Sequence, residues 1–105
     1  MDQTTFETLA ERALAAFADA IEAALDDADV EHGGGILTVT LADRRQFVVN
    51  RHATNRQIWL SSPISGAHHY DPAEGRWRDS RGGADLAEQL AADLRAATGV
   101  AVTLG

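Results

Sequence analysis

The chain has 105 residues, of which 45% are apolar, and this is enough for one small domain with a single modest core. Sixteen acidic and nine basic residues give a net charge of −7, which disfavours nucleic acid and anionic lipid as partners. The absence of cysteine excludes disulfides, thiolate metal sites and a cysteine nucleophile. No apolar run is long enough to cross a membrane, and no signal or transit peptide pattern is visible. We therefore expect one domain over residues 1–105, located in the cytoplasm.

The N-terminal part of the chain predicts one long amphipathic helix. Thr4 and Glu7 have the spacing of a capping box, so we expect the helix to begin at Thr4. Apolar residues then recur at steps of three and four and form a stripe that should cover the core. The stripe consists of Phe6, Leu9, Ala10, Ala13, Phe17, Ile21, Leu25 and Ala28.

Acidic side chains are concentrated at the end of this helix and directly after it. No arginine or lysine occurs between Arg12 and Arg44, and the segment 19–31 alone carries six of the sixteen acids. Because negative charge near a helix C-terminus costs roughly 0.3–1 kcal/mol per residue, this placement favours a function for the acids. The acids expected on a ridge of the helix are Asp19, Glu22 and Asp26, and those expected beyond it are Asp27, Asp29 and Glu31.

Carboxylate oxygens are the ligands that hard cations such as iron, manganese, magnesium and calcium prefer. His32 adds one nitrogen donor to the acidic segment. An EF-hand loop is excluded, because His32 stands where that loop requires glycine and Thr38 where it requires glutamate. Carboxylates spread along a ridge predict shallow, weak sites. The residues alone also leave a second interpretation open, in which the acids only keep the helix face solvated.

After Gly33–Gly35, which end the helical segment, alternating residues predict an antiparallel sheet. The alternation turns Trp77 inward and Trp59 outward, beside Thr38, Thr40 and Asn50. A large aromatic side chain on a wet sheet face is unusual, so either a loop covers Trp59 or a partner contacts it. We expect about five strands, at 36–41, 46–51, 56–61, 67–71 and 76–79, with 52–55 as a loop.

A second helix is predicted where leucines recur at steps of four, at Leu86, Leu90 and Leu94. We expect Asp79 or Ser80 to cap its start and Gly99 to end it. The residues after Gly99 should form a short final strand or an extended tail. Two helices with one-sided apolar stripes must cover the one apolar face of the sheet. The predicted fold class is therefore α+β, a two-layer sandwich with both helices on one sheet face.

No enzyme motif is present. His68 and His69 are adjacent on a predicted strand, so their side chains leave opposite faces and cannot chelate one ion together. Ser61 and Ser62 lack a nucleophile elbow. The glycine run at 33–35 lacks the spacing of a phosphate-binding loop and the helix that follows one.

The run Val49–Pro63, which reads V-N-R-H-A-T-N-R-Q-I-W-L-S-S-P, strongly resembles the frataxin/CyaY family. Within it, Gln57–Pro63 is unusually similar to the mitochondrial members. The composition and the missing transit segment suggest a bacterial member. With the acidic first helix, the resemblance spans nearly the whole chain. Further matches are the Gly34–Thr38 strand opening, Ser65-Gly66, Tyr70-Asp71 and Trp77.

The resemblance implies a non-enzymatic role in iron–sulfur cluster assembly. It implies weak binding of Fe²⁺ or Fe³⁺ and of other divalent cations. It also implies contacts with the cysteine desulfurase and its scaffold protein. Carried over by position, the metal residues are Asp19, Glu22, Asp26, Asp27, Asp29 and Glu31. His32, which follows them in the chain, is the seventh expected metal residue, on its nitrogen donor alone. The partner-binding residues are Asn50, Gln57, Trp59 and His69.

Two departures from the family pattern are visible. Ala18, Ala23 and Ala24 interrupt the acidic ridge, and His69 stands where mitochondrial members carry an arginine used in partner contact. The expected function is that of an iron-binding regulator or iron chaperone that acts on the desulfurase–scaffold complex. The alternative is iron storage or detoxification with weak ferroxidase activity. We expect a monomer that metal can drive into oligomers.

Overall fold

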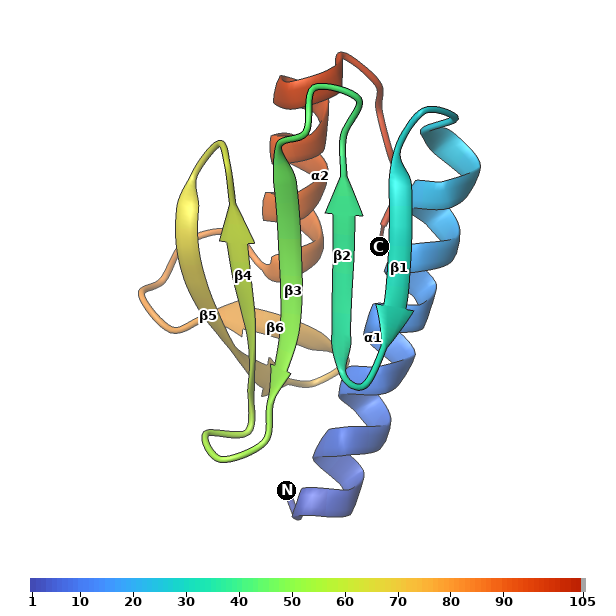
Figure 1. The fold of residues 1–105 in the computed structure, drawn as a ribbon. Helices are drawn as coiled ribbons and strands as arrows, with labels where there is room; N and C mark the ends of the chain where they lie inside the picture. Colours follow the sequence, from blue (N-terminus) through green and yellow to red (C-terminus); the bar gives the residue numbers. More distant parts are fainter. Residues whose placement is uncertain (105) are drawn as a thin grey trace.

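The computed structural model describes residues 1–104 and shows two layers, a six-stranded antiparallel sheet and two helices packed against one of its faces (Figure 1). The strands are hydrogen-bonded in chain order from β1 to β6. The predicted α+β sandwich is therefore confirmed, with six strands where about five were expected. The elements are α1 (Gln3–Ala24), β1 (Asp29–Gly33), β2 (Ile36–Thr40), β3 (Gln46–His52), β4 (Gln57–Ser62), β5 (Gly66–Ala73), β6 (Arg76–Asp79) and α2 (Leu86–Thr98).

The additional strand, β1, is formed by the acidic segment that we expected to be a connection. It pairs antiparallel with β2, and Gly34 and Gly35 make the turn between them at φ angles of 61° and 79°. Two successive positive φ angles are the signature of the type I′ turn, which suits a two-residue hairpin. The glycine run therefore marks a hairpin as well as the end of the helical segment. The side chains of β1 are mostly exposed and polar, so they gave no apolar alternation from which to predict a strand.

The N-terminal caps of both helices differ from the predicted ones. Asp2 caps α1 and Asp85 caps α2, each with a carboxylate that accepts the backbone N–H three residues later, at 2.8 Å and 2.9 Å. This hydrogen bond lowers the pKa of Asp2 below its ordinary value. The caps expected at Thr4 and at Asp79 or Ser80 are wrong, because an aspartate adjoining each helix supplies the acceptor instead.

The end of α1 also lies earlier than predicted. The helix stops at Ala24, and the N–H of Leu25 makes the last hydrogen bond of the helix. Asp26, which we expected on the helix, therefore lies with Asp27 in the turn that leads to β1. Ala28 likewise lies outside the helix.

The hydrophobic core fills the space between the helices and one face of the sheet. Phe6 of α1 meets Trp77 of β6 edge to face, with ring centroids 5.9 Å apart, so the inward position of Trp77 is confirmed. Gly99 ends α2 at φ 77°, as predicted, and the chain beyond it is an extended tail without a strand. No helix within residues 1–104 is long and apolar enough to span a bilayer. The fully buried core side chains include Leu14, Ile21, Leu37, Val39, Phe47, Val49, Ile58, Tyr70, Leu86, Leu90 and Leu94.

A polar network that is buried at Ser62, Asp79 and Asp93 ties the β4–β5 turn to α2. Asp93 of α2 accepts hydrogen bonds from the hydroxyls of Ser62, at 2.7 Å, and Ser65. His68 extends the network, with Nε2 2.8 Å from the Ser65 hydroxyl and Nδ1 3.3 Å from Asp79. Buried polar groups that are fully hydrogen-bonded in this way hold a segment in one position.

The hairpin glycines offer a test of this fold. Replacing Gly35 by Ala is expected to lower the free energy of unfolding by about 1–3 kcal/mol. The positive φ strains any side chain there, and the new Cβ would lie 2.9 Å from the Arg51 guanidinium. Urea unfolding measures the change.

Gly34→Asn is the matched control, because this position also has a positive φ but its Cβ would meet nothing within 4 Å. Asparagine followed by glycine suits a type I′ turn, so we expect a change of no more than about 0.5 kcal/mol. Equal losses in both variants would contradict a special requirement for glycine beside Arg51.

Candidate functional site

The sheet face opposite the helices brings three of the predicted partner-binding residues together. Asn50 of β3 pairs with Trp59 of β4, which in turn pairs with His69 of β5. Cross-strand partners project to the same face, so these side chains form one row across the sheet. His68 points to the helix side and His69 to this open face, so the two side chains leave opposite faces, as predicted.

Trp59 is held between two histidine rings. The His52 ring lies 3.7 Å from the indole by ring centroids, with 10° between the planes, and the His69 ring lies 4.2 Å away at 11°. Aromatic pairs of this kind contribute about 0.5–1.5 kcal/mol beyond the area they bury. Both faces of the indole are thus covered, by side chains of the same sheet face and not by a loop. We call these three residues the His–Trp–His stack.

Hydrogen bonds fix the edge of the indole as well. Trp59 Nε1 donates to Gln57 Oε1 at 2.8 Å, and Gln57 Nε2 donates to Asp71 Oδ1 at 2.9 Å. Both polar ends of the Gln57 amide are therefore used within the chain. Gln57 orients the indole from β4, and Asp71 fixes Gln57 from β5.

A groove of about 200 Å³ lies beside the stack. Its walls combine the apolar side chains of Val48 and Ala67 with the polar ones of Asn50 and Ser61. A mixed surface of this kind beside a fixed aromatic ring is typical of the centre of a protein–protein interface.

The six predicted carboxylates lie along one edge of the molecule, where α1 and β1 run side by side (Figure 1). All six are exposed. Asp29 and Glu31 of β1 pair with Thr40 and Thr38 and therefore project to the open face. The acidic edge, which we define as residues Asp19, Glu22, Asp26, Asp27, Asp29 and Glu31, thus continues into the open sheet face.

His32 is not brought together with these acids. Its Nε2 lies 2.7 Å from Glu11 Oε1 on α1, and Arg51 Nη1 lies 3.8 Å from the other oxygen of Glu11. The ring therefore points to the helix side, whereas Glu31, its neighbour in β1, points to the open face. Within residues 1–104, no three histidine, aspartate or glutamate side chains converge closely enough to hold a metal ion.

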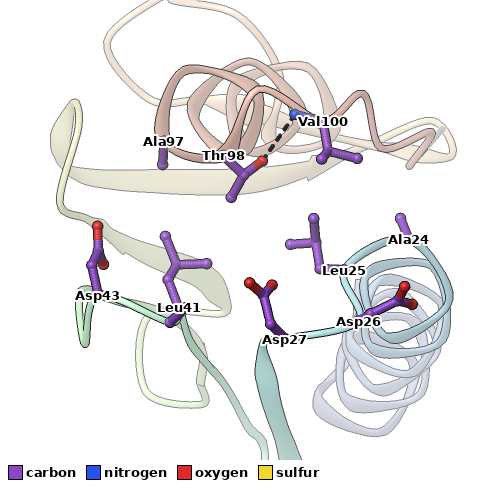
Figure 2. A pocket seen from close by; sticks show the side chains of 10 residues that line it. Ala24, Leu25, Asp26, Asp27, Leu41, Asp43, Ala97, Thr98 and Val100 are labelled. Carbon is purple, nitrogen blue, oxygen red and sulfur yellow. Dashed lines mark hydrogen bonds between the residues drawn. The ribbon is translucent and has the colours of Figure 1, made fainter.

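A pocket of about 490 Å³ lies at the end of the molecule where both helices terminate (Figure 2). Asp27 points its carboxylate into the space between Leu41 and Leu25, whereas Asp26 points away from it (Figure 2). Asp43, from the β2–β3 turn, adds a carboxylate at the rim of this pocket. A backbone N–H of the same turn, 3.0 Å from Asp43, lowers the pKa of its carboxyl and keeps it charged.

Sequence reasoning missed one residue of this pocket, Asp43, and one residue of the open sheet face, His52. Asp43 lies far from the acidic edge in sequence and reaches it only through the fold. His52 was assigned to a loop, although it continues the alternation of Val48 and Asn50 by one more step. Extending the strand by that step would have placed His52 on the open face.

Comparisons with a family model, with curated proteins and with solved structures all identify the same family. The chain matches the family model of the frataxin-like domain over residues 1–100. It is 40% identical over 106 residues to the iron-sulfur cluster assembly protein CyaY of Dechloromonas aromatica (strain RCB), a match that covers 99% of both chains. It is 39% identical over 94 residues to a mitochondrial frataxin-like protein of Leishmania donovani, covering 82% of this chain and 49% of that protein.

Solved structures share the fold. The frataxin of Psychromonas ingrahamii superimposes with a TM-score of 0.90 at 27% identity, over 100% of this chain and 99% of that one. A trimeric frataxin from the yeast Saccharomyces cerevisiae, complexed with ferrous iron, superimposes with a TM-score of 0.71 at 28% identity, over 94% and 88% of the two chains.

The hydrogen bond from the indole can be tested directly. In a Gln57→Leu variant we expect the Trp59 Nε1–H signal to shift in ¹H–¹⁵N spectra and the free energy of unfolding to fall by about 1 kcal/mol, because the indole loses its acceptor. Ser61→Ala is the control, since Ser61 is exposed in the same strand. An unshifted indole signal in Gln57→Leu would show that this hydrogen bond does not form in solution.

Proposed function

The chain belongs to the frataxin/CyaY family, and from this premise we propose that it acts in iron–sulfur cluster assembly as a weak iron binder that docks on the cysteine desulfurase and its scaffold protein. Support comes from the relative of 40% identity, which is named an iron-sulfur cluster assembly protein. That name refers to assembly and not to a catalysed reaction, which supports a binding role over an enzymatic one.

The observation that carries this proposal is the continuity between the acidic edge and the open sheet face. The edge holds six carboxylates of a chain whose net charge is −7. The negative electric field of these carboxylates accelerates the approach of a basic protein surface. The His–Trp–His stack on the same sheet face then gives the contact its specificity. Because Asp29 and Glu31 project to the open face, a single partner surface contacts both the acidic edge and the sheet face that carries Trp59.

Iron is held in this proposal by the exposed carboxylates of the acidic edge. Oxygen donors that are spread over α1, the following turn and β1 give several weak sites instead of one closed cage. Weak binding suits a protein that receives iron and passes it on. His32, our seventh predicted ligand, contributes only after it separates from Glu11, so the six carboxylates are the primary ligands.

Iron storage with weak ferroxidase activity is the second candidate function. The observation that favours it is the trimeric state of the yeast frataxin that was solved with ferrous iron. Storage requires metal to drive copies of this chain together. Sedimentation with and without Fe(II) separates the two candidates, because a chain that stays monomeric when loaded with iron cannot store it in this way.

Neutralising the acidic edge tests the docking proposal. The triple variant Asp19→Asn, Glu22→Gln and Asp26→Asn is expected to bind the desulfurase–scaffold complex at least about tenfold more weakly, because the attraction to a basic surface is reduced. Its free energy of unfolding is expected to rise by roughly 0.5 kcal/mol, since like charges near the end of α1 are removed. Calorimetric titration and urea unfolding measure the two effects.

A triple variant with the same change of charge away from the edge is the control for this experiment. Glu7→Gln, Glu74→Gln and Glu88→Gln together should leave the affinity within about threefold, because electrostatic attraction depends on where the charge lies. Equal losses in both variants would show that only net charge matters and would remove the acidic edge from the docking site.

Iron binding is tested separately by anaerobic titration with Fe(II), followed in ¹H–¹⁵N spectra. We expect the amide signals of residues 19–32 to broaden first, because unpaired electrons relax nearby nuclei. Signals of the β5–β6 hairpin serve as the internal reference and should broaden last. Broadening that begins elsewhere, or none at millimolar iron, would refute the assignment of iron to the acidic edge.

A further inference from the structure

His52 is the one ring of the His–Trp–His stack that the family comparison gave no reason to single out. It lies closer to Trp59 than His69 does, at 3.7 Å against 4.2 Å between ring centroids. Its backbone still belongs to β3, where it pairs with Gln57 at the start of β4. The stack is therefore built at the end of the β3–β4 hairpin.

The turn after β3 holds the edge of the His52 ring. The backbone N–H of Asn55 donates to His52 Nδ1 at 3.3 Å, so this nitrogen is an acceptor and the ring cannot rotate without losing the bond. The turn itself is closed by a hydrogen bond from the Arg56 N–H to the Ala53 carbonyl, at 3.3 Å. The positive φ of Arg56, 51°, is part of this tight turn.

The same turn is anchored to the beginning of α1. Gln3 Nε2 donates to the Ala53 carbonyl at 3.3 Å, and Arg56 Nε donates to Gln3 Oε1 at 3.0 Å. The contacts thus run from α1 through the turn to His52, and from His52 to the indole of Trp59. A side chain on an otherwise open face is in this way connected to the rigid helix layer.

The opposite side of the indole is supported differently. His69 follows His68, whose ring is fixed on the helix side between Ser65 and Asp79. Within residues 1–104, the His69 ring itself makes no hydrogen bond. The two histidines therefore differ: hydrogen bonding fixes the ring of His52, whereas the ring of His69 is held by stacking alone.

We propose that His52 is the positioning residue of the docking site, and that its ring presets the orientation in which Trp59 meets the partner. This inference rests on the proposed function. Immobilising a flexible side chain on binding costs free energy, and a side chain that is already fixed avoids this cost. With both its faces covered, the indole meets the partner through its edge, together with the outer faces of the two imidazoles.

Two substitutions of His52 separate its ring from its hydrogen bond. His52→Phe keeps a flat ring against the indole but cannot accept from the Asn55 N–H. His52→Gln keeps a polar acceptor but has no ring. If the ring positions Trp59, His52→Gln weakens binding to the desulfurase–scaffold complex roughly three- to tenfold, and His52→Phe stays within about twofold of the parent. The reverse order would show that His52 only caps the turn, and would overturn the proposal.

A readout without any partner keeps this test independent of the proposed function. In the parent, ring currents from parallel stacking should shift the Trp59 ring protons upfield in ¹H spectra. The upfield shift should persist in His52→Phe and decrease in His52→Gln to the part that the His69 ring contributes. An unchanged shift in His52→Gln overturns the positioning role, even if partner binding changes.

The two proposals fail in distinguishable ways. If the parent binds no desulfurase–scaffold complex but the ring-current shifts follow the expected order, the proposed function fails and the positioning of Trp59 by His52 stands as a property of the fold. If the parent binds and both His52 variants bind equally well, docking stands and the positioning proposal fails.

Discussion

The open sheet face, with every side chain on it, depends on the burial of the opposite sheet face beneath two helices. Side chains alternate along a strand, so the residues that fill the core force their neighbours toward water. Leu37 and Val39 are buried, and Thr38 is therefore outward; Leu60 is buried, and Trp59 is therefore outward. The open face is the unavoidable counterpart of the core, and the residues found on it are free to serve recognition.

The acidic edge has a structural role as well as a proposed function. β1 is an edge strand, and charged side chains on an edge strand discourage pairing with another sheet. Asp29 and Glu31 provide that protection and at the same time extend the acidic charge onto the open face. Protection of the edge and attraction of a basic partner thus call for the same residue types at the same positions. The solvated-face interpretation and the docking interpretation are therefore compatible.

The His–Trp–His stack reduces the exposure of a large aromatic ring on the open face. An indole with both faces in water would be a liability for solubility, yet a partner-binding site needs a large aromatic ring. Stacking Trp59 between His52 and His69 covers its faces with rings that are themselves half polar. The Gln57 and Asp71 hydrogen bonds then fix its edge. The result is a half-buried ring that stacking and a hydrogen bond hold on the open face.

Local periodicity in the sequence was sufficient to predict the two helices, five of the strands and the outward position of Trp59, because burial repeats at 3.6 residues in a helix and 2 in a strand. The run around Trp59 also identified the family. The same reasoning failed where apolar alternation is absent: β1 has polar, exposed side chains, and His52 continues a strand beyond its last apolar residue.

Only the tertiary structure decided which distant residues meet. The sequence placed His32 beside Glu31, but the pleat of β1 turns it toward Glu11 on α1, 21 positions earlier in the chain. Nothing in the sequence indicated that Asp43 lines the pocket beside Asp27, or that His52 stacks on the indole of Trp59. The acidic charge and the exposed tryptophan were thus determined by the sequence itself. Their union into one surface required the β1 hairpin and the pairing of β4 with β3 and β5. Contacts between distant segments follow from strand register and leave no periodic trace in the chain.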